Sequence, residues 1–300
     1  MPKTSGDSRD MVQAVFRMDC TIKDPLFGTP GKGRTVQTME FEGGRNQLSL
    51  TLSAKESSVL LRDYRLTIEP AVDATYSLYA KDLLDNAQAL DYLQKIAHFF
   101  QSPSILVTAS LFAKRYSVLT MASAFYAMSR YDKGLHCRIE NLWVEAEYTK
   151  PWLPTIRLID RTVSIPTKDR EKWRDEILRE IFANNLAKVW QSLAKISKIP
   201  KAILWENTAI YVNWLYETKL GEGASEQEKA RIQEDYHYIV NLAPGSIFGE
   251  RKNPLTDYCG PKVTIKESEQ PVRLRKTCCF YYHTSDEASD YCISCPKIKR

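Results

Sequence analysis

The spacing of apolar positions divides the chain into an N-terminal part with strand-like alternation and a longer part with helical periodicity. Apolar and polar residues partly alternate over 36–41 and 47–52, on either side of a Gly-Gly turn, which predicts a β-hairpin. Residues 60–68 predict a further strand. From about residue 80 to Phe100, apolar residues recur mostly at three- and four-residue steps, which predicts one amphipathic helix.

The next segment has the pattern of a central helix. It is predicted to run from Ser104 to about Tyr131, after a Ser102-Pro103 pair that suits a helix start. Because it is apolar nearly all round, we expect it to lie at the centre of the fold. Lys114 and Arg115 interrupt it, so they must find acidic partners, reach solvent or face a polar cavity.

The remaining pattern predicts two more strands, three more helices and an extended C-terminal stretch. In chain order these are strands over 138–148 and 155–163, helices over 166–200, 201–219 and 225–241, and an extended stretch over 263–276. The helix over 225–241 is charged, and Glu234, Asp235 and His237 are expected on its solvated face.

These elements predict a mostly helical α+β fold. We expect a β-rich N-terminal region over residues 1–79, a helical core over 80–262 and a C-terminal segment over 263–300.

Composition excludes several classes of protein. With 43% hydrophobic and 26% charged residues, the chain can bury a core and is not disordered throughout. The 42 Lys and Arg against 37 Asp and Glu are a mild excess that does not indicate a nucleic-acid partner. Walker A, GxGxxG, GxSxG and HExxH motifs are absent from the sequence.

The sequence also argues against a membrane span. The first residues are polar, and the most apolar stretch, 105–128, contains Lys114 and Arg115 near its middle. We therefore expect a cytoplasmic protein that is not transmembrane, either free or peripheral at the inner face of the membrane.

Four of the seven cysteines lie in the last 23 residues: Cys278, Cys279, Cys292 and Cys295. In a reducing compartment such a cluster is expected to bind metal and not to form disulfides. A C-x-x-C turn presents two thiolates to one centre, whereas adjacent cysteines in extended backbone point to opposite faces. This favours an iron–sulfur cluster, which needs four thiolates, and leaves open a four-cysteine zinc knuckle or redox-linked disulfides. Arg273, Arg275 and Lys276 flank the cluster, and such cations lower thiolate pKa values and raise cluster potentials.

A family resemblance is carried by this tail. Arg273–Tyr282, with its Thr-Cys-Cys-Phe-Tyr-Tyr stretch, and the closing Cys-x-x-Cys-Pro resemble the C-terminal signature of FhuF-like ferric siderophore reductases. Further similarity lies in residues 110–116, 201–207 and 253–255, so the resemblance covers roughly residues 80 to 300. Twelve residues separate the two cysteine pairs, where the family pattern has about ten. We expect the longer loop to leave the ligands in place and to change what covers the cluster.

The resemblance implies a cytoplasmic bacterial oxidoreductase with a [2Fe-2S] cluster on the four cysteines. Its substrate would be a ferric siderophore of the hydroxamate or citrate-hydroxamate type, with a ferredoxin, flavodoxin or reductase as external electron donor. No catalytic residue beyond the cluster is expected, and Cys20, Cys137 and Cys259 should be dispensable. The alternative is a zinc-stabilised module that binds a siderophore or a protein without redox activity.

Seven residues are candidates for contact with the substrate: Lys114, Arg115, Trp205, Asn207, Arg273, Arg275 and Lys276. Asn207 is an amide within an apolar stripe, so it needs a hydrogen-bond partner. Three roles would give it one: a structural hydrogen bond to backbone, a place in the wall of a pocket, or orientation of the cluster segment.

Overall fold

The computed structural model describes residues 51–148, 152–266, 268–285 and 291–300. The hairpin predicted over 36–52 therefore lies almost entirely outside the described residues.

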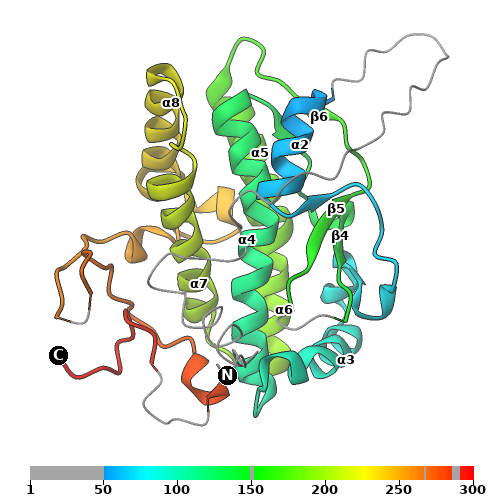
Figure 1. Cartoon of the computed structure of the whole chain (residues 1–300), viewed down its shortest axis with the longest axis vertical. Helices are drawn as coiled ribbons and strands as arrows, with labels where there is room; N and C mark the ends of the chain where they lie inside the picture. Colours follow the sequence, from blue (N-terminus) through cyan, green and yellow to red (C-terminus); the bar gives the residue numbers. More distant parts are fainter. Residues whose placement is uncertain (1–50, 149–151, 267, 286–290) are drawn as a thin grey trace, which may run out of the picture.

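The fold is built around helix α4 (Ile105–Tyr131), as the sequence predicts. Every residue of this helix from Val107 to Ser129 is buried. In Figure 1 the helix stands in the middle of the molecule, with the other helices and the small sheet around it. It is the one described helix long and apolar enough to cross a membrane, but 89% of its apolar window is buried inside the protein. This is the burial expected for the core helix of a soluble fold.

The other helices pack around α4. Their bounds are α2 (Ala54–Asp63), α3 (Asn86–Ile96), α5 (Arg170–Ile181), α6 (Ala187–Ser197), α7 (Lys201–Trp214) and α8 (Glu226–His237). The strands lie in the long connections between α2 and α3 and between α4 and α5. Turns of π-helix continue α5, α7 and α8 over Phe182–Leu186, Leu215–Lys219 and Tyr238–Leu242. Single 3₁₀ turns are Ala74–Tyr76, Ala80–Leu84, Ala97–Phe100, Ile139–Asn141, Gly245–Phe248, Thr256–Tyr258 and Tyr281–Thr284.

A small sheet covers one side of the helices, on the right in Figure 1. It has the order β1-β5-β4-β2, with β1 (Leu66–Thr67), β2 (Leu78–Tyr79), β4 (Leu142–Glu145) and β5 (Thr155–Leu158). Strands β4 and β5 are antiparallel and lie within the two strands predicted from alternation. A separate pair joins β3 (Gly134–Leu135) to β6 (Val163–Ser164). The observed architecture confirms a mostly helical α+β fold.

The strand predicted over 60–68 is wrong in its first half. Helix α2 includes these residues and ends at Asp63. A capping box stabilises its start: the Ser53 side chain accepts from the backbone amide of Glu56, and the Glu56 carboxylate accepts from the backbone amide of Ser53. Only Leu66–Thr67 is a strand. The described part of the N-terminal region is therefore less rich in strands than expected.

Three helix starts also differ from the prediction. The single helix predicted from residue 80 is interrupted at Asp85, whose carboxylate caps α3. The cap of α4 is Ser104, which accepts from Val107, and not Ser102. Helix α5 begins after Asp169, several residues later than residue 166. In each case a side-chain acceptor that satisfies the first free amides sets the boundary.

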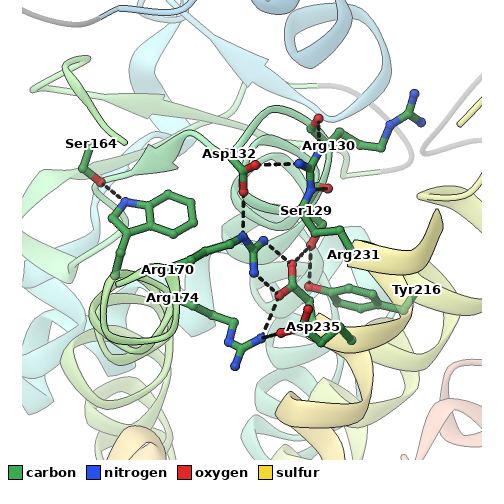
Figure 2. Close-up of polar contacts among 11 residues, drawn as sticks. Ser129, Arg130, Asp132, Ser164, Arg170, Arg174, Tyr216, Arg231 and Asp235 are labelled. Carbon is green, nitrogen blue, oxygen red and sulfur yellow. Dashed lines mark hydrogen bonds and ion pairs between the residues drawn. The ribbon is translucent and has the colours of Figure 1, made fainter. Parts of the chain in front are cut away.

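Asp235 on α8 is the clearest correction, because it is fully buried and not on a solvated face. Figure 2 shows its carboxylate between α4, α5 and α8. Arg170 donates to both oxygens at 2.7 and 2.8 Å, Arg174 donates at 3.1 Å, and Ser129 donates at 2.9 Å. Although α8 is charged overall, its Asp235 forms buried ion pairs with Arg170 and Arg174 that hold the helix against the core.

We expect Asp235→Asn to lower the free energy of unfolding by about 3 kcal/mol. The substitution keeps the size of the side chain but leaves the buried guanidinium of Arg174 without this charge partner, and breaking a buried pair on one side costs roughly that amount. Urea unfolding followed by circular dichroism measures the change. Glu226→Gln, at an exposed position of the same helix, is the control and should keep the midpoint of the native protein. An Asp235→Asn variant as stable as the native protein would contradict this account.

Candidate metal centre

The four C-terminal cysteines lie on a segment with little secondary structure, which we call the C-terminal arm (described residues from Val263 to Arg300). It runs beside α7 and reaches the lower end of α4, drawn in orange and red in Figure 1. Its regular features are one β-bridge between Val263 and Val272 and the turn Tyr281–Thr284. Contacts with the helices must therefore hold the arm in place.

The four thiols of the arm form a continuous group. The Sγ atoms of Cys278 and Cys295 are 3.9 Å apart. Cys279 is hydrogen-bonded to Cys292, and Cys292 in turn to Cys295. The contacts therefore run Cys279–Cys292–Cys295–Cys278, and each cysteine of the adjacent pair meets a different cysteine of the C-x-x-C turn. Cys278 is half-buried, whereas the other three are buried.

Backbone hydrogen bonds bring the two cysteine pairs together. Within the C-x-x-C turn, Cys295 N donates to Cys292 O at 2.8 Å, and Arg275 N donates to Ser294 O at 2.9 Å across the two halves of the arm. The chain turns sharply after the Cys-Cys pair at Phe280, whose φ is 64°. The amide of Phe280 then donates to Cys278 Sγ at 3.4 Å.

This donor set fits an iron–sulfur cluster. Two thiolates bonded at about 2.3 Å to one tetrahedral metal lie roughly 3.8 Å apart, close to the separation of Cys278 and Cys295. Among the described residues, no three His, Cys, Asp or Glu side chains are arranged to hold one metal ion. Four thiols in neighbouring pairs suit a centre whose metal atoms each take two of them.

Glu206 on α7 holds the arm immediately before the cysteines. Its carboxylate accepts from the backbone amides of Lys276 and Thr277 at 2.6 and 2.8 Å, and from the Thr277 hydroxyl. Charge-assisted bonds of this kind are stronger than bonds between neutral groups. Glu206 is itself buried, so it places two residues of the arm on a fixed point of the core.

Asn207, the next residue of α7, connects the arm to α4. Its amide nitrogen donates to Ser110 O and Oγ at 3.1 and 3.2 Å, while its oxygen accepts from Arg275 at 2.7 Å. Ser110 Oγ donates in turn to Cys279 O at 2.8 Å. Asn207 is fully buried, so among the three possibilities of the sequence analysis the structure supports bonding to backbone and orienting the cluster segment.

Lys114 lies one turn beyond Ser110 on α4 and is 3% exposed. Its Nζ donates to Cys279 Sγ at 3.6 Å. Of the three environments that the sequence offered for this lysine, burial excludes solvent, and the side chain contacts a thiol. Arg115 is also buried.

Burial and neighbouring charges perturb the protonation of this group. The hydrogen bond with Cys292, together with burial, raises the pKa of the Cys279 thiol to about 12, although Lys114 and Arg275 act in the opposite direction. Burial raises the pKa of Cys278. The hydrogen bond with Cys292 lowers the pKa of Cys295. Burial also lowers the pKa of Lys114, and the charges of Cys279 and Cys292 counteract this.

The other candidate residues lie in two places. Trp205 is buried and donates to Glu250 at 3.1 Å, packed beside Phe248. Arg273 and Lys276 help to line a pocket of about 280 Å³, whose wall also includes Tyr258, Gly260 and Leu274. Arg273 is bound there by Glu217 at 2.7 Å, and this bond lowers the pKa of Glu217 against the opposing effect of burial.

Sequence reasoning missed Ser110 and Glu206 as site residues, although both lie in segments that carry the family resemblance. Glu206 offered a signal, because it is an acidic residue in an otherwise apolar helix. Ser110 offered none, since a serine in a buried helix commonly bonds to its own backbone.

Comparison with known families agrees with this geometry. The model described as ferric iron reductase FhuF-like transporter matches residues 110–258. The model of the FhuF 2Fe-2S C-terminal domain matches residues 275–297, which include all four cysteines of the arm. No curated protein matches the chain. The two matches together span more than half of the sequence and both parts of the site, so the chain belongs to the FhuF-like family of ferric iron reductases and carries its [2Fe-2S] C-terminal domain.

Proposed function

We propose that this protein is a cytoplasmic ferric siderophore reductase whose cluster ligands are Cys278, Cys279, Cys292 and Cys295. The observation that carries the proposal is the convergence of these four thiols on an arm that buried side chains of α4 and α7 fix in place. A [2Fe-2S] cluster supplies a one-electron carrier when bound. Siderophores hold Fe(III) far more tightly than Fe(II), so one electron releases the iron and leaves the chelator intact.

Different residues of the chain would hold the arm, bond to the sulfurs and leave one side of the cluster accessible. Glu206 and Asn207 fix the backbone before and at the cysteines. The Phe280 amide and Lys114 direct N–H groups at two of the sulfurs. Because Cys278 is the least buried of the four, its side is the natural point of electron exchange.

The pocket beside the arm is where we propose that part of the ferric chelate binds. Lys276, two residues before Cys278, lines it together with Arg273 and Asp257. Because Arg273 is paired with Glu217, Lys276 is the cation that we expect to meet a polar or anionic ligand there. Its volume, about 280 Å³, is at the lower limit for a ligand site, so it would take part of a siderophore only. We expect the hydroxamate and citrate-hydroxamate classes as substrates.

The electron donor is proposed to be an acidic carrier protein such as a ferredoxin or flavodoxin, or a reductase. The exposed residues of the arm around the cysteines include four cations: Lys276, Lys297, Lys299 and Arg300. Arg300 also donates to the carbonyl of Cys295, which places positive charge next to the thiols. Complementary charge would guide the donor to this side.

One prediction of the proposed function concerns the ligands. Replacing Cys278, Cys279, Cys292 or Cys295 singly by Ser should remove or destabilise the cluster, which is measured as visible absorbance and as iron and sulfide per anaerobically purified chain. The native protein should hold about two irons and two sulfides. Cys259→Ser is the matched control, because Cys259 bonds to Asn213 and belongs to another part of the fold. A colourless Cys259→Ser variant beside a coloured Cys278→Ser variant would refute the assignment.

A further prediction tests the reaction. The cluster-loaded protein is reduced with dithionite, freed of excess reductant and mixed with a ferric hydroxamate and an Fe(II) trap. The cluster bands should return as Fe(II) appears in the trap, with about one Fe(II) per cluster, because each cluster carries one electron. A cluster that stays reduced beside the chelate would refute the reductase. Zinc in place of iron, with no visible bands, would establish the alternative of a zinc-stabilised binding module.

Another prediction tests whether the exposed cations of the arm guide the electron donor. The double variant Lys297→Glu/Lys299→Glu should slow reduction of the cluster by an acidic ferredoxin about tenfold at low ionic strength, since steering by charge changes association rates by at least that much. Stopped-flow absorbance measures the rate, and high salt should remove the difference. The double variant Lys55→Glu/Lys172→Glu has the same change in net charge on exposed positions of α2 and α5, and should keep the native rate. Equal rates in both double variants would contradict the proposed surface.

A further inference from the structure

The contact between Lys114 and Cys279 is unusual because it brings a buried amine to the sulfur of a proposed cluster ligand. The Nζ–Sγ distance is 3.6 Å, and both side chains are buried. Placing an ammonium group in the core of a helical fold is costly unless a negative charge compensates for it. The thiolate that Cys279 would become on binding the cluster supplies such a charge at the distance of this contact.

The placement of this lysine is fixed by the same helix that fixes the cysteine. Ser110 and Lys114 are four residues apart on α4, so they lie on the same face of the helix. Ser110 Oγ donates to the carbonyl of Cys279 at 2.8 Å, while Lys114 donates to its sulfur. Asn207 in turn holds Ser110 from α7. Both the backbone and the side chain of Cys279 are thus set by one turn of a buried helix.

The contact matters for reduction because the bound cluster would be negatively charged. Four thiolates, two ferric ions and two sulfides carry two net negative charges, and reduction by one electron adds a third. A cation at contact distance stabilises the more negative state more strongly, and low-dielectric surroundings increase the difference. Hydrogen bonds to cluster sulfurs act in the same direction.

We propose that Lys114 is a positioning residue that acts through Cys279 and raises the reduction potential of the cluster. It holds an N–H donor and a positive charge on the sulfur of Cys279. This inference rests on the proposed ligation of the cluster by Cys279, and it is independent of the identity of the substrate and of the electron donor.

The midpoint potential of the full-length, cluster-loaded protein tests the proposal. Lys114→Met removes the charge and the donor but keeps a long apolar side chain. We expect its potential to fall by about 59 mV or more, which is a tenfold change in the equilibrium constant of a one-electron couple. Lys114→Arg keeps a charge and N–H donors and should recover most of the native potential.

Lys188→Met is the control for this measurement. Lys188 lies on α6 and pairs with Glu140 at 3.5 Å, away from the arm, so its replacement should leave the potential unchanged. A native potential in Lys114→Met would overturn the proposal. An equal fall in Lys114→Met and Lys114→Arg would also overturn it, because shape and not charge would then be responsible.

A second measurement requires no apolar variant and covers the case in which Lys114→Met fails to hold the cluster. The native protein is grown with lysine labelled with ¹⁵N at Nζ alone, and the reduced cluster is studied by pulsed EPR. A ¹⁵N coupling is expected, and it should disappear in Lys114→Arg. A native protein without this coupling would overturn the contact. A protein that shows the coupling and the shift in potential but does not reduce ferric chelates would refute the proposed function and leave the role of Lys114 intact.

Discussion

The arrangement of the site depends on two neighbouring side chains of α7, Glu206 and Asn207, that bind an arm which has almost no secondary structure. Most backbone groups of such a segment are not fixed by a helix or a sheet, so its position must come from contacts with side chains. Glu206 accepts two consecutive amides of the arm, and Asn207 bridges Arg275 to Ser110. Because these groups are buried, each would incur a desolvation cost if it lost its partner, and the arm is held in one place and register.

The same network makes the two sides of the thiol group chemically different. On the inner side, Cys279 is covered by α4 and meets Lys114. On the outer side, Cys278 is half-buried and accepts from the Phe280 amide, and the arm that carries it has exposed lysines. A one-electron centre needs both a controlled potential and a route for electrons. In the proposed reductase, the buried helix would provide the first and the exposed edge of the arm the second.

The sequence predicted the parts of this structure that depend on local patterns. Periodicity predicted α4 and α7, and the number and placement of the C-terminal cysteines predicted a metal centre. The pairs that position the site could not be predicted, because they join residues far apart in the chain: Glu206 lies 70 residues before Lys276, and Ser110 lies 169 residues before Cys279. Lys114 shows the same limit, since a charged residue in an apolar helix reveals that it needs a particular environment but not which one. Asp235 shows a further limit, because the charged pattern of α8 does not reveal that this carboxylate is buried.

The charged residues buried beside the arm connect the cofactor to the stability of the fold. Lys114 and Arg275 place positive charge around Cys279, whose free thiol is neutral at physiological pH because its pKa is about 12. Arg275 also pairs with Glu206 at 3.6 Å. A bound cluster would convert the four thiols to thiolates and add negative charge beside both cations. The free energy of cluster binding would then also contribute to the folding free energy of the arm, because the four ligands lie on it. Arg275 therefore takes part both in the contacts that hold the arm and in the positive charge beside the thiols, so fixing the arm and binding the cluster depend on the same part of the fold.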